Sequence, residues 1–599
     1  MSAHVLPPFP VTVQESLDEE ETFAAMFEKY IDADADIPEP PDAATARGID
    51  TLPPEVMLMI FQVLAAATPG NVLVRWDHER VPREWLVVNL VCRYWRRLAC
   101  GFPVLWRAID VEGCVEWLQL CLVRSGSAPL DIRLYNHTTL FQAAALLLKH
   151  TERIRSLIVT DDAAANSLHA LGSLFMVGMP ALEELYLDAC RPGTPLAGKC
   201  LYDVFLLGRT SENIFPSLRT LHLSGLYLPP TASLLRGLRV LELVESHPGS
   251  FASQLTFEEF LDALEACPTL EKLKLWSSFP FRIERDNVDR VVALPNLRLL
   301  SLLCPSDHGN ANSAVKTTRC SYLLSHLRLA ESTAITVFAP VRLRERKSFL
   351  DHIPNNPACL PILRAANQAI LKGAWEFAVS MPCPCAQCSR LDSELLHMHP
   401  GDGETACDKD TGGLSMILVN PCRCSADDSV GEEDAAVREF AELFVAAPLR
   451  RLELFYGASQ VGFGHLFSSF RGLSVLALEC CGYATRDNMR DFVYALAGPL
   501  AWGSDGARLD ENDTAPMPQL RWLCVHQACW YGELAQDLET CLRSRKAKGA
   551  GKLQELHVVL KSAKGTKRRK LNNMRETKLR ALASLVETVN VEFMNTRVV

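Results

Sequence analysis

The sequence predicts an α/β chain in which a small helical unit near the N-terminus is followed by a long, irregular array of strand-and-helix repeats. Three observations support this prediction: apolar residues at helical spacing from residue 52, a short leucine-rich frame that recurs from residue 154, and helix signals between its copies. The 599 residues exceed what one compact core of ordinary size accommodates, and 48% hydrophobic residues exclude a wholly disordered chain.

Residues 1–48 form an acidic, proline-bearing segment. This composition is typical of an arm that stays disordered, because it buries too little apolar surface to offset the entropy of ordering. The alternative is a short partner-binding helix around Phe23, Phe27 and Ile31. We expect the folded part of the chain to begin near Leu52.

The first predicted helix is apolar on most of its circumference. Pro53 and Pro54 suit a first turn, whose amides have no helical acceptor, and Glu55 lies at the positive end of the helix dipole. Its apolar positions are Val56, Met57, Ile60, Phe61 and Leu64 on one face, with Leu58, Met59 and Val63 on the other. Such a helix needs neighbours on two sides.

A second helix is predicted in the stretch LVVNLVCRYWRRLACG, with Gly101 at its C-terminal cap. The positions expected to face inward are Val87, Val91, Tyr94, Trp95 and Leu98, and those expected to face water are Arg93, Arg96 and Arg97. The two helices can bury one face against each other. Part of the apolar surface of the first helix then still lacks a partner.

From residue 154 onward, an apolar residue is followed three and five positions later by two more. The copies are IRSLIV at 154, LEELYL at 182, LRTLHL at 218, LRVLEL at 238, LEKLKL at 270, LRLLSL at 297, LSHLRL at 324, LSMILV at 414, LRRLEL at 449, LSVLAL at 473, LRWLCV at 520 and LQELHV at 553. The last three positions alternate as a strand does, so each copy predicts one short strand.

The segments between these strands carry helix signals where they are regular. Thr256 and Glu259 form a capping-box pattern, and Pro268 ends the helix before the next strand. This alternation is the layout of a leucine-rich-repeat solenoid, in which no repeat buries its leucines alone. The Asn or Cys position that usually follows the frame is filled only by Cys190, Cys422 and Cys481. We therefore expect an irregular solenoid.

The stretch LPPEVMLMIF, followed by LVCRYWRRLACGFPVLWRAID, resembles the F-box family in the version with C-terminal leucine-rich repeats, and the segments after it resemble fungal F-box proteins. The resemblance implies that the F-box docks on the Skp adaptor of an SCF ubiquitin ligase and reaches the cullin through it. It also implies that the repeats bind a protein substrate for ubiquitin-dependent degradation. The implied adaptor-binding residues are Leu52, Pro53, Val56, Ile60, Phe61, Leu64, Val91, Cys92, Trp95 and Leu98.

These interpretations divide the chain into six segments. They are an acidic disordered arm (1–48), the F-box (49–111), a first set of leucine-rich repeats (112–330), an insertion with a Cys/His-rich loop (331–413), a second set of repeats (414–560) and a basic C-terminal segment (561–599).

The sequence contains no P-loop, nucleophile-elbow or HExxH motif, so we expect a non-catalytic substrate adaptor that acts by tethering. The alternative is a leucine-rich-repeat interaction scaffold unconnected with ubiquitin transfer. Substrate contacts are expected at the variable strand positions, such as Tyr186, His222, Glu242, Lys274, Glu453 and His557. The identity of the substrate is not readable from the sequence.

Cysteines and histidines concentrate in residues 383–424. The zinc candidates are Cys383, Cys385, Cys388, Cys407, Cys422 and Cys424. Thiolates at such spacing could hold Zn²⁺, but Cys-x-Cys pairs are less diagnostic than paired CxxC knuckles. A cysteine-bearing loop without a cofactor is therefore the favoured interpretation, with zinc as the alternative.

Charge and hydropathy limit the remaining partners. The net charge of −10 and the absence of basic motifs interleaved with aromatic residues argue against nucleic acid as a partner. The stretch KSAKGTKRRKLNNMRETK is interpreted as a solvated linker, with a nuclear-import signal or a polyanion contact as the alternative. The longest apolar run, near residues 56–67, is too short to cross a bilayer, and 21 cysteines without an export signal favour the cytoplasm or the nucleus.

Overall fold

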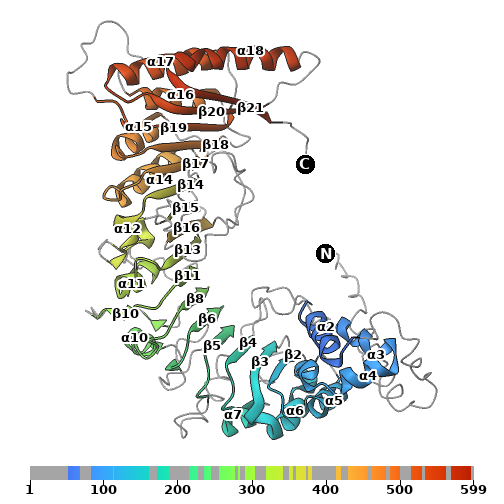
Figure 1. Cartoon of the computed structure of the whole chain (residues 1–599). Coiled ribbons are helices and arrows are strands. Elements are labelled where there is room, and N and C mark those ends of the chain that lie inside the picture. The colour runs from blue at the N-terminus through green and yellow to red at the C-terminus, as the bar shows by residue number, and fades with distance from the viewer. Residues whose placement is uncertain are drawn as a thin grey trace, which may run out of the picture. The chain divides into compact units, whose positions relative to one another are not determined.

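The structure is a computed structural model of the 599-residue chain. It describes residues 52–67, 83–111, 114–135, 137–160, 171–188, 215–224, 226, 235–244, 255–276, 281–282, 290–303, 319–340, 350–354, 359–372, 376–380, 413–419, 430–455, 460–479, 486–498, 514–528, 533–561 and 568–594. The fold is mixed α/β, with helices near the N-terminus and strands alternating with helices after them (Figure 1).

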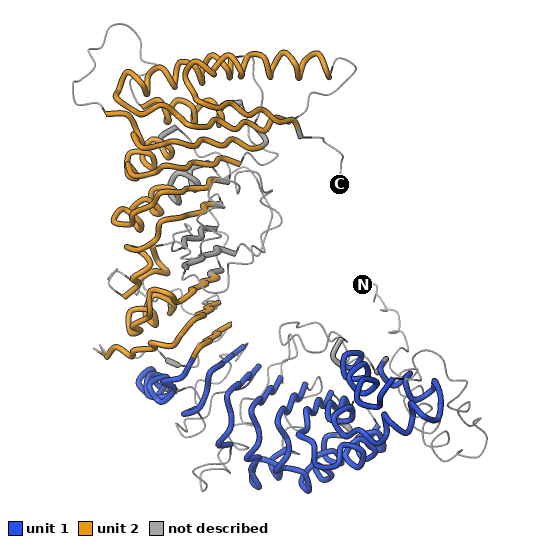
Figure 2. The backbone as a smooth tube through the Cα atoms, in the orientation of Figure 1, with its two compact units in different colours: residues 1–270, 280–284 blue, residues 271–279, 285–599 orange. Residues whose placement is uncertain are grey.

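The chain divides into two compact units (Figure 2). Unit 1 comprises residues 1–270 and 280–284, and unit 2 comprises residues 271–279 and 285–599. Among the described residues, no helix is both long enough and apolar enough to span a bilayer.

Unit 1 begins with a helical region. Its elements are α2 (Pro54–Ala67), η3 (Arg83–Val87), α3 (Val88–Val91), α4 (Arg93–Cys100) and η4 (Pro103–Trp106). The helix predicted from LVVNLVCRYWRRLACG is thus interrupted, because Cys92 adopts extended backbone (φ −159°, ψ 168°) between α3 and α4. The expectation that Val87 and Val91 face inward is wrong: the break leaves both exposed. Gly101 follows α4 as its C-cap, as predicted.

A parallel sheet follows in unit 1, and its strands pair in chain order. They are β1 (Ala108–Val111), β2 (Leu130–Leu134), β3 (Ile154–Thr160), β4 (Glu184–Asp188), β5 (Thr220–Ser224) and β6 (Val240–Val244). The register aligns buried leucines, since Leu185 lies opposite Leu157 on one side and Leu221 on the other. The leucine frame therefore forms a continuous apolar layer across the strands.

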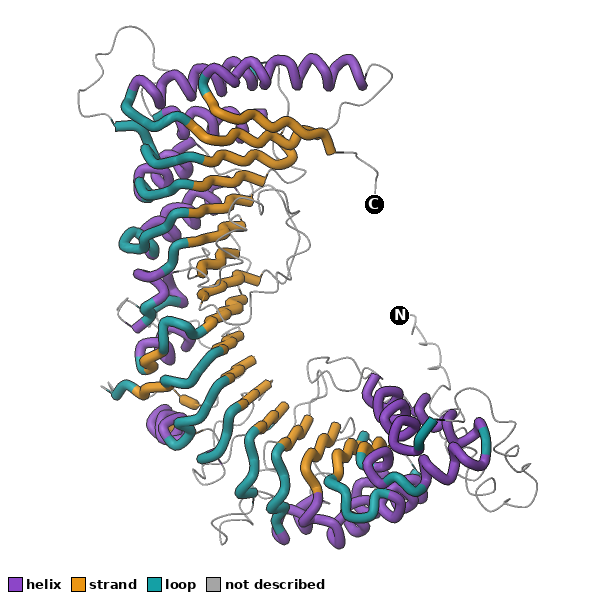
Figure 3. Tube along the Cα trace, in the orientation of Figure 1, coloured by secondary structure: helices purple, strands orange, loops and turns teal. Residues whose placement is uncertain are grey.

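The helices between the strands of unit 1 lie along one side of these strands (Figure 3). They are α5 (Val115–Arg124), α6 (His137–Leu147), η5 (Leu148–Arg153), α7 (Gly172–Val177) and α10 (Phe257–Glu265), and a short strand pair joins β7 (Leu255–Thr256) to β9 (Phe281–Arg282). The predicted capping box of α10 is present: Glu259 N donates to Thr256 Oγ1, and Thr256 N donates to Glu259 Oε2. The helix ends at Glu265, shortly before Pro268.

Unit 2 contains a longer sheet that is parallel except at one strand. In spatial order the strands are β8 (Lys272–Trp276), β11 (Leu299–Leu303), β13 (Ala334–Pro340), β16 (Gly413–Val419), β15 (Glu376–Ser380), β14 (Gln368–Lys372), β17 (Arg451–Phe455), β18 (Val475–Glu479), β19 (Trp522–Ala528), β20 (Leu553–Lys561) and β21 (Val586–Met594). Strand β15 runs antiparallel to both of its neighbours, β14 and β16.

Helices alternate with most strands of unit 2. They are α11 (Arg319–Ser325), η8 (Leu350–His352), α12 (Ile362–Ala365), α14 (Val430–Leu443), α15 (Gln460–Ser469), α16 (Arg486–Ala497), α17 (Leu534–Ala547), α18 (Arg568–Arg580) and η11 (Ala581–Ser584). The rings of Phe463 and Phe467 on α15 meet the ring of Phe492 on α16, with centroids 5.4 and 5.8 Å away. Aromatic packing thus joins neighbouring helices.

Every predicted copy of the leucine frame overlaps a strand, which confirms the strand prediction. The copy at residue 324 differs, because α11 ends at Ser325 and β12 (Leu327–Leu329) pairs only with β10 (Val292–Leu294). Strands that the frame did not predict are β1, β2, β7, β9, β10, β13, β14, β15 and β21. Of these, β13, β14 and β15 lie within residues 331–413, the segment interpreted as an insertion.

Candidate functional site

The helical region of unit 1 is organised around Trp106, which is fully buried. Its indole Nε1 donates to Ala99 O at 2.8 Å, so the one polar atom of the ring is satisfied. The ring meets Trp85 edge-on, with centroids 5.3 Å apart, and Trp117 at 6.0 Å. This cluster fixes η3, η4 and α5 against one another.

Among the described side chains of helix α2, a narrow stripe is fully buried and the remaining residues are half-buried or exposed. Met57 and Phe61 are fully buried, and the Phe61 ring lies 5.3 Å from the ring of Trp95 on α4. By contrast, Met59, Val63 and Leu64 are 60%, 65% and 44% exposed. The expected surplus of apolar surface on this helix is therefore present, but the inward stripe is narrower than predicted.

A second group of exposed aliphatic side chains lies on η3 and α3. Val87, Leu90 and Val91 are 58%, 61% and 54% exposed, although Trp85 and Leu86 beside them are buried. Together with the exposed residues of α2, these define the apolar surface: Met59, Val63, Leu64, Val87, Leu90 and Val91. Exposed aliphatic residues that are frequent within one small domain are typical of an interaction site.

Polar contacts hold this second group in a fixed geometry. The buried amide of Asn89 donates to Leu86 O at 3.1 Å, and Arg96 Nε donates to Asn89 O at 2.9 Å. The Cys92 Sγ accepts from the amide of Trp95 at 3.5 Å, which caps α4. Helices α3 and α4 are therefore locked to each other without covering Leu90 or Val91.

The residues predicted from the family resemblance fall into three groups. Pro53, Leu64 and Val91 are exposed; Leu52, Val56, Ile60, Cys92, Trp95 and Leu98 are half-buried; and Phe61 is buried. All lie on α2, α3 and α4 or directly beside them. The residues implied by the resemblance do not include Met59, Val63, Val87 or Leu90, although the sequence pattern already placed Met59 and Val63 on the second apolar face of the first helix. The four-residue spacing of Met59 and Val63 was a usable signal, because such residues share one helix face.

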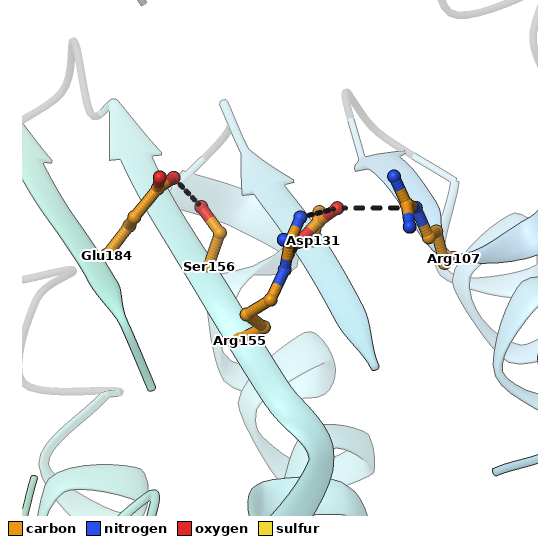
Figure 4. A network of polar contacts seen from close by, with 5 residues as sticks. All are labelled: Arg107, Asp131, Arg155, Ser156 and Glu184. Atoms are coloured by element: carbon orange, nitrogen blue, oxygen red, sulfur yellow. Dashed lines mark hydrogen bonds and ion pairs between the residues drawn. The ribbon is translucent and has the colours of Figure 1, made fainter. Parts of the chain in front are cut away.

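The strands next to this region carry a polar network on neighbouring positions (Figure 4). Arg155 binds Asp131 through two hydrogen bonds, Nε to Oδ1 at 2.9 Å and Nη2 to Oδ2 at 2.7 Å. Arg107 Nε approaches the same carboxylate at 3.7 Å, and Ser156 Oγ donates to Glu184 Oε2 at 3.1 Å. These contacts join β1 to β4 and also raise the pKa of Arg155, chiefly through the Asp131 hydrogen bond.

The predicted variable positions Tyr186, His222 and Glu242 occupy successive strands of unit 1. The Tyr186 and His222 rings stack with centroids 3.7 Å apart and planes 6° apart, and His222 Nδ1 lies 3.0 Å from Glu242 Oε2. Burial raises the pKa of Tyr186, with further contributions from the charges of Asp188 and Glu242. The three residues lie opposite one another in the strand register, so they share one face of the sheet.

Two further groups of such positions occur in unit 2. Lys274 Nζ lies 3.8 Å from the ring centroid of Trp276, whose Nε1 donates to Ser301 Oγ at 3.0 Å. His557 Nδ1 lies 3.6 Å from Cys524 Sγ. Burial, aided by nearby glutamates, raises the pKa of the Cys524 thiol to about 12, so it stays protonated near neutral pH. Glu453, the remaining predicted position, accepts from Arg451 within the same strand.

The zinc candidates Cys383, Cys385, Cys388, Cys407, Cys422 and Cys424 lie outside the described residues. Within the described part of the chain, no group of three or more His, Cys, Asp or Glu residues is arranged to hold a metal ion. The described cysteines include free thiols such as Cys92 and Cys541, whereas Cys320 is disulfide-bonded. The acidic arm, residues 1–48, likewise lies outside the described residues.

Comparison with known families assigns the helical region. Residues 49–112 match the family described as F-box-like, and the boundaries agree with the predicted F-box at 49–111. The match covers the elements from α2 to β1, with Trp85 and Trp106 of the cluster but not Trp117, and it includes α2, η3 and α3, which carry the apolar surface. No curated protein matches the chain.

Proposed function

We propose, from the F-box-like domain at residues 49–112, that this chain is a substrate-recognition subunit of an SCF-type ubiquitin ligase. The domain would bind the Skp adaptor and reach the cullin through it. The remainder of the chain would bind a protein substrate for ubiquitination. F-box domains generally bind Skp adaptors, which makes adaptor binding the first step of this proposal.

The observation that supports adaptor binding best is the apolar surface. It presents six apolar side chains, each 44% to 65% exposed. The inner faces of the helices that carry them already pack around the buried side chains of Phe61 and Trp106. Fully burying one such side chain is worth up to about 1.5–3 kcal/mol, so a partner groove would gain substantially from covering several. Short helices with exposed aliphatic anchors suit recognition by a helix-binding groove.

The residues implied by the family resemblance then take two roles. Leu64 and Val91 would contact the adaptor directly because they are exposed. Phe61 would contribute indirectly, because its buried ring packs on Trp95 and so fixes the position of α2. We assign direct contact also to Met59, Val63, Val87 and Leu90, the most exposed aliphatic residues of the domain.

We further propose that the strands and helices after the domain are irregular leucine-rich repeats. Support comes from the LxxLxL frame and from parallel pairing in which frame leucines of neighbouring strands align. The substrate would contact the variable positions on the strands, among them Tyr186, His222, Lys274 and His557. Specificity would then arise from side chains contributed by several repeats.

The proposed role requires no catalytic residue in this chain. Holding a substrate lysine close to a ubiquitin-conjugating enzyme raises its effective concentration, and the rate gain comes from that tethering. The proposed site of action is the cytoplasm or the nucleus.

Co-purification from the native host tests the proposal. The tagged chain is expected to recover a Skp adaptor and a cullin, and the double variant Val63→Asp/Leu90→Asp is expected to recover neither. Val123→Asp is the matched control, because Val123 is 74% exposed on α5, outside the domain. Docking through the apolar surface would be contradicted if the control also failed to recover the adaptor, or if the double variant still recovered it.

The same experiment separates the alternative function, an interaction scaffold unconnected with ubiquitin transfer. A scaffold of that class would recover other proteins without a cullin. Recovery of the cullin together with ubiquitinated proteins that disappear in Val63→Asp/Leu90→Asp would favour the ligase subunit.

A further inference from the structure

The last helix of unit 2 is α18 (Arg568–Arg580; Figure 1), and most of its exposed side chains are basic or polar. Its inner side is anchored by Leu579, which is fully buried next to β21 and η11. The exposed side chains are Arg569, Lys570, Leu571, Asn573, Met574, Thr577, Lys578 and Arg580. Lys570, Met574 and Lys578 follow each other at four-residue spacing, so they lie along one line on the outer face.

Negative charge is scarce on this helix. Residues 561–580 contain nine Lys or Arg and one acidic residue, Glu576, in a chain whose net charge is −10. Glu576 is engaged within the helix, because Arg580 Nη2 and Nε bind its Oε1 at 2.8 and 2.9 Å. Among the described residues, no carboxylate forms an ion pair with Arg569, Lys570 or Lys578. The outer face therefore presents uncompensated positive charge.

The helical state of this segment decides between two kinds of partner. A receptor that reads basic residues from an extended peptide would have to unwind α18 and expose Leu579. A rigid polyanion needs no unwinding, because Lys570 and Lys578 already lie on the outer side of a helix about 20 Å long and Arg569 lies on the flank beside Lys570. The geometry therefore favours a polyanion that meets a preformed surface.

We propose that the outer face of α18, defined by Arg569, Lys570 and Lys578, binds the phosphate backbone of double-stranded DNA without reading its sequence. Lys and Arg supply phosphate contacts in such complexes, and Asn and Thr side chains such as Asn573 and Thr577 add neutral ones. The acidic balance of the whole chain argues against general attraction to nucleic acid. This face is a local exception, and it is independent of adaptor binding.

Other polyanions fit this face less well. Single strands are held by bases stacking on aromatic side chains, and α18 contains no aromatic residue. Shape-based binding of double-stranded RNA spreads over about 16 base pairs, more than one helix of this length covers. Membrane-surface helices carry several large apolar anchors, whereas the described part of α18 exposes only Leu571 and Met574, at 37% and 43%.

Fluorescence anisotropy with the full-length chain and a labelled 24-base-pair DNA duplex of arbitrary sequence tests the proposal. The variant Arg569→Ala/Lys570→Ala/Lys578→Ala is compared with the control Arg236→Ala/Arg298→Ala/Arg471→Ala, which removes the same charge from exposed positions elsewhere. At 50 mM salt, the α18 variant is expected to bind at least about tenfold more weakly, while the control binds as the parent does. The log–log salt dependence should become shallower by about 2–3, since each lost phosphate contact removes about 0.9.

Three results would overturn the proposal: equal loss in both variants, no loss in the α18 variant, or binding of anionic phospholipid vesicles, RNA or polyglutamate in preference to the duplex. Circular dichroism melting of both variants verifies that the substitutions, all at exposed positions, leave the fold intact. The adaptor co-purification is expected to be unchanged in the α18 variant, so the two proposals can fail separately.

Discussion

The guanidinium of Arg545 donates a hydrogen bond to the carbonyl oxygen of Met517 at 3.0 Å. Met517 is the one described non-glycine residue with a positive φ, at 46°. The same buried side chain, on α17, also donates to Leu496 O at 3.2 Å and to Pro516 O at 2.6 Å. One arginine therefore satisfies carbonyls at the end of α16 and in the turn before β19, where the chain has no regular partner.

Replacing Arg545 is expected to destabilise unit 2. Arg545→Met keeps most of the side-chain volume but leaves three carbonyl oxygens without a donor, so we expect the free energy of unfolding to fall by about 3–5 kcal/mol. Differential scanning calorimetry of the full chain measures the change. Arg543→Met, two residues earlier and exposed, is the control and should stay within about 0.5 kcal/mol. Equal thermograms for Arg545→Met and the parent would refute the anchoring role.

Two substitutions in the F-box-like domain should separate folding from docking. Phe61→Ala removes a fully buried ring from the α2–α4 contact, so it is expected to lower stability by about 3–5 kcal/mol and to weaken adaptor binding with it. Leu90→Ser changes an exposed residue and should weaken adaptor binding while the melting temperature holds. Titration of the purified chain with the adaptor, beside a thermal melt, gives both quantities. If Leu90→Ser binds as tightly as the parent, α3 does not contribute to docking.

Acidification is expected to destabilise the fold through His352. Burial lowers the pKa of His352 from its ordinary 6.5 to about 4. Above pH 6.5 the imidazole is neutral in both states; between pH 6.5 and 4 the unfolded chain takes up the proton more readily, so stability falls as pH falls through this window. His352→Gln should reduce the loss of melting temperature between pH 7.5 and pH 5. Parallel pH profiles for parent and variant would exclude this histidine as a cause.

The buried cysteines should resist alkylation in the native protein. Burial raises the pKa of Cys267, Cys524 and Cys541 to about 12, so their thiols are both inaccessible and protonated at pH 8. Iodoacetamide followed by peptide mass spectrometry should leave these three unmodified until urea is added, while the less buried Cys92 reacts. Rapid native labelling of Cys524 would indicate an ionised thiol and would reopen a catalytic interpretation.

The strand positions were predictable because the leucines of the frame are the residues that the strands bury. Leu157, Leu185 and Leu221 alternate with polar neighbours, align across β3, β4 and β5, and form one buried layer. Strands such as β13 (AITVFAP) were missed because they are buried by β-branched and aromatic residues outside that frame. The copy at 324 placed its first leucine in α11, because a three-and-five spacing also fits part of a helix.

The candidate site was only partly predictable. The matched motif located the domain, yet it could not show which side of each helix faces outward. Helical periodicity placed Val87 and Val91 inside, but the extended backbone at Cys92 divides that helix and turns them out. Cysteine is not among the residues preferred at helix N-caps, so single-sequence periodicity gives no signal for this break. The exposure of Leu90 and Val63 follows from how the residues around Trp106 and Phe61 pack in the tertiary structure, and the sequence pattern does not show that packing.

The antiparallel strand β15 affects the order in which the strands can pair while the chain is being synthesised. Strands β2 to β6 can each pair with the strand synthesised before them, and β13 can pair in this way with β11, but the other neighbour of β13 is β16, which is synthesised only after β14 and β15. The local β14–β15 hairpin can form first, whereas the free edge of β13 has to wait for residues 413–419. During that interval the nascent chain carries an unpaired strand edge, which is the state most prone to capture by chaperones or by other chains.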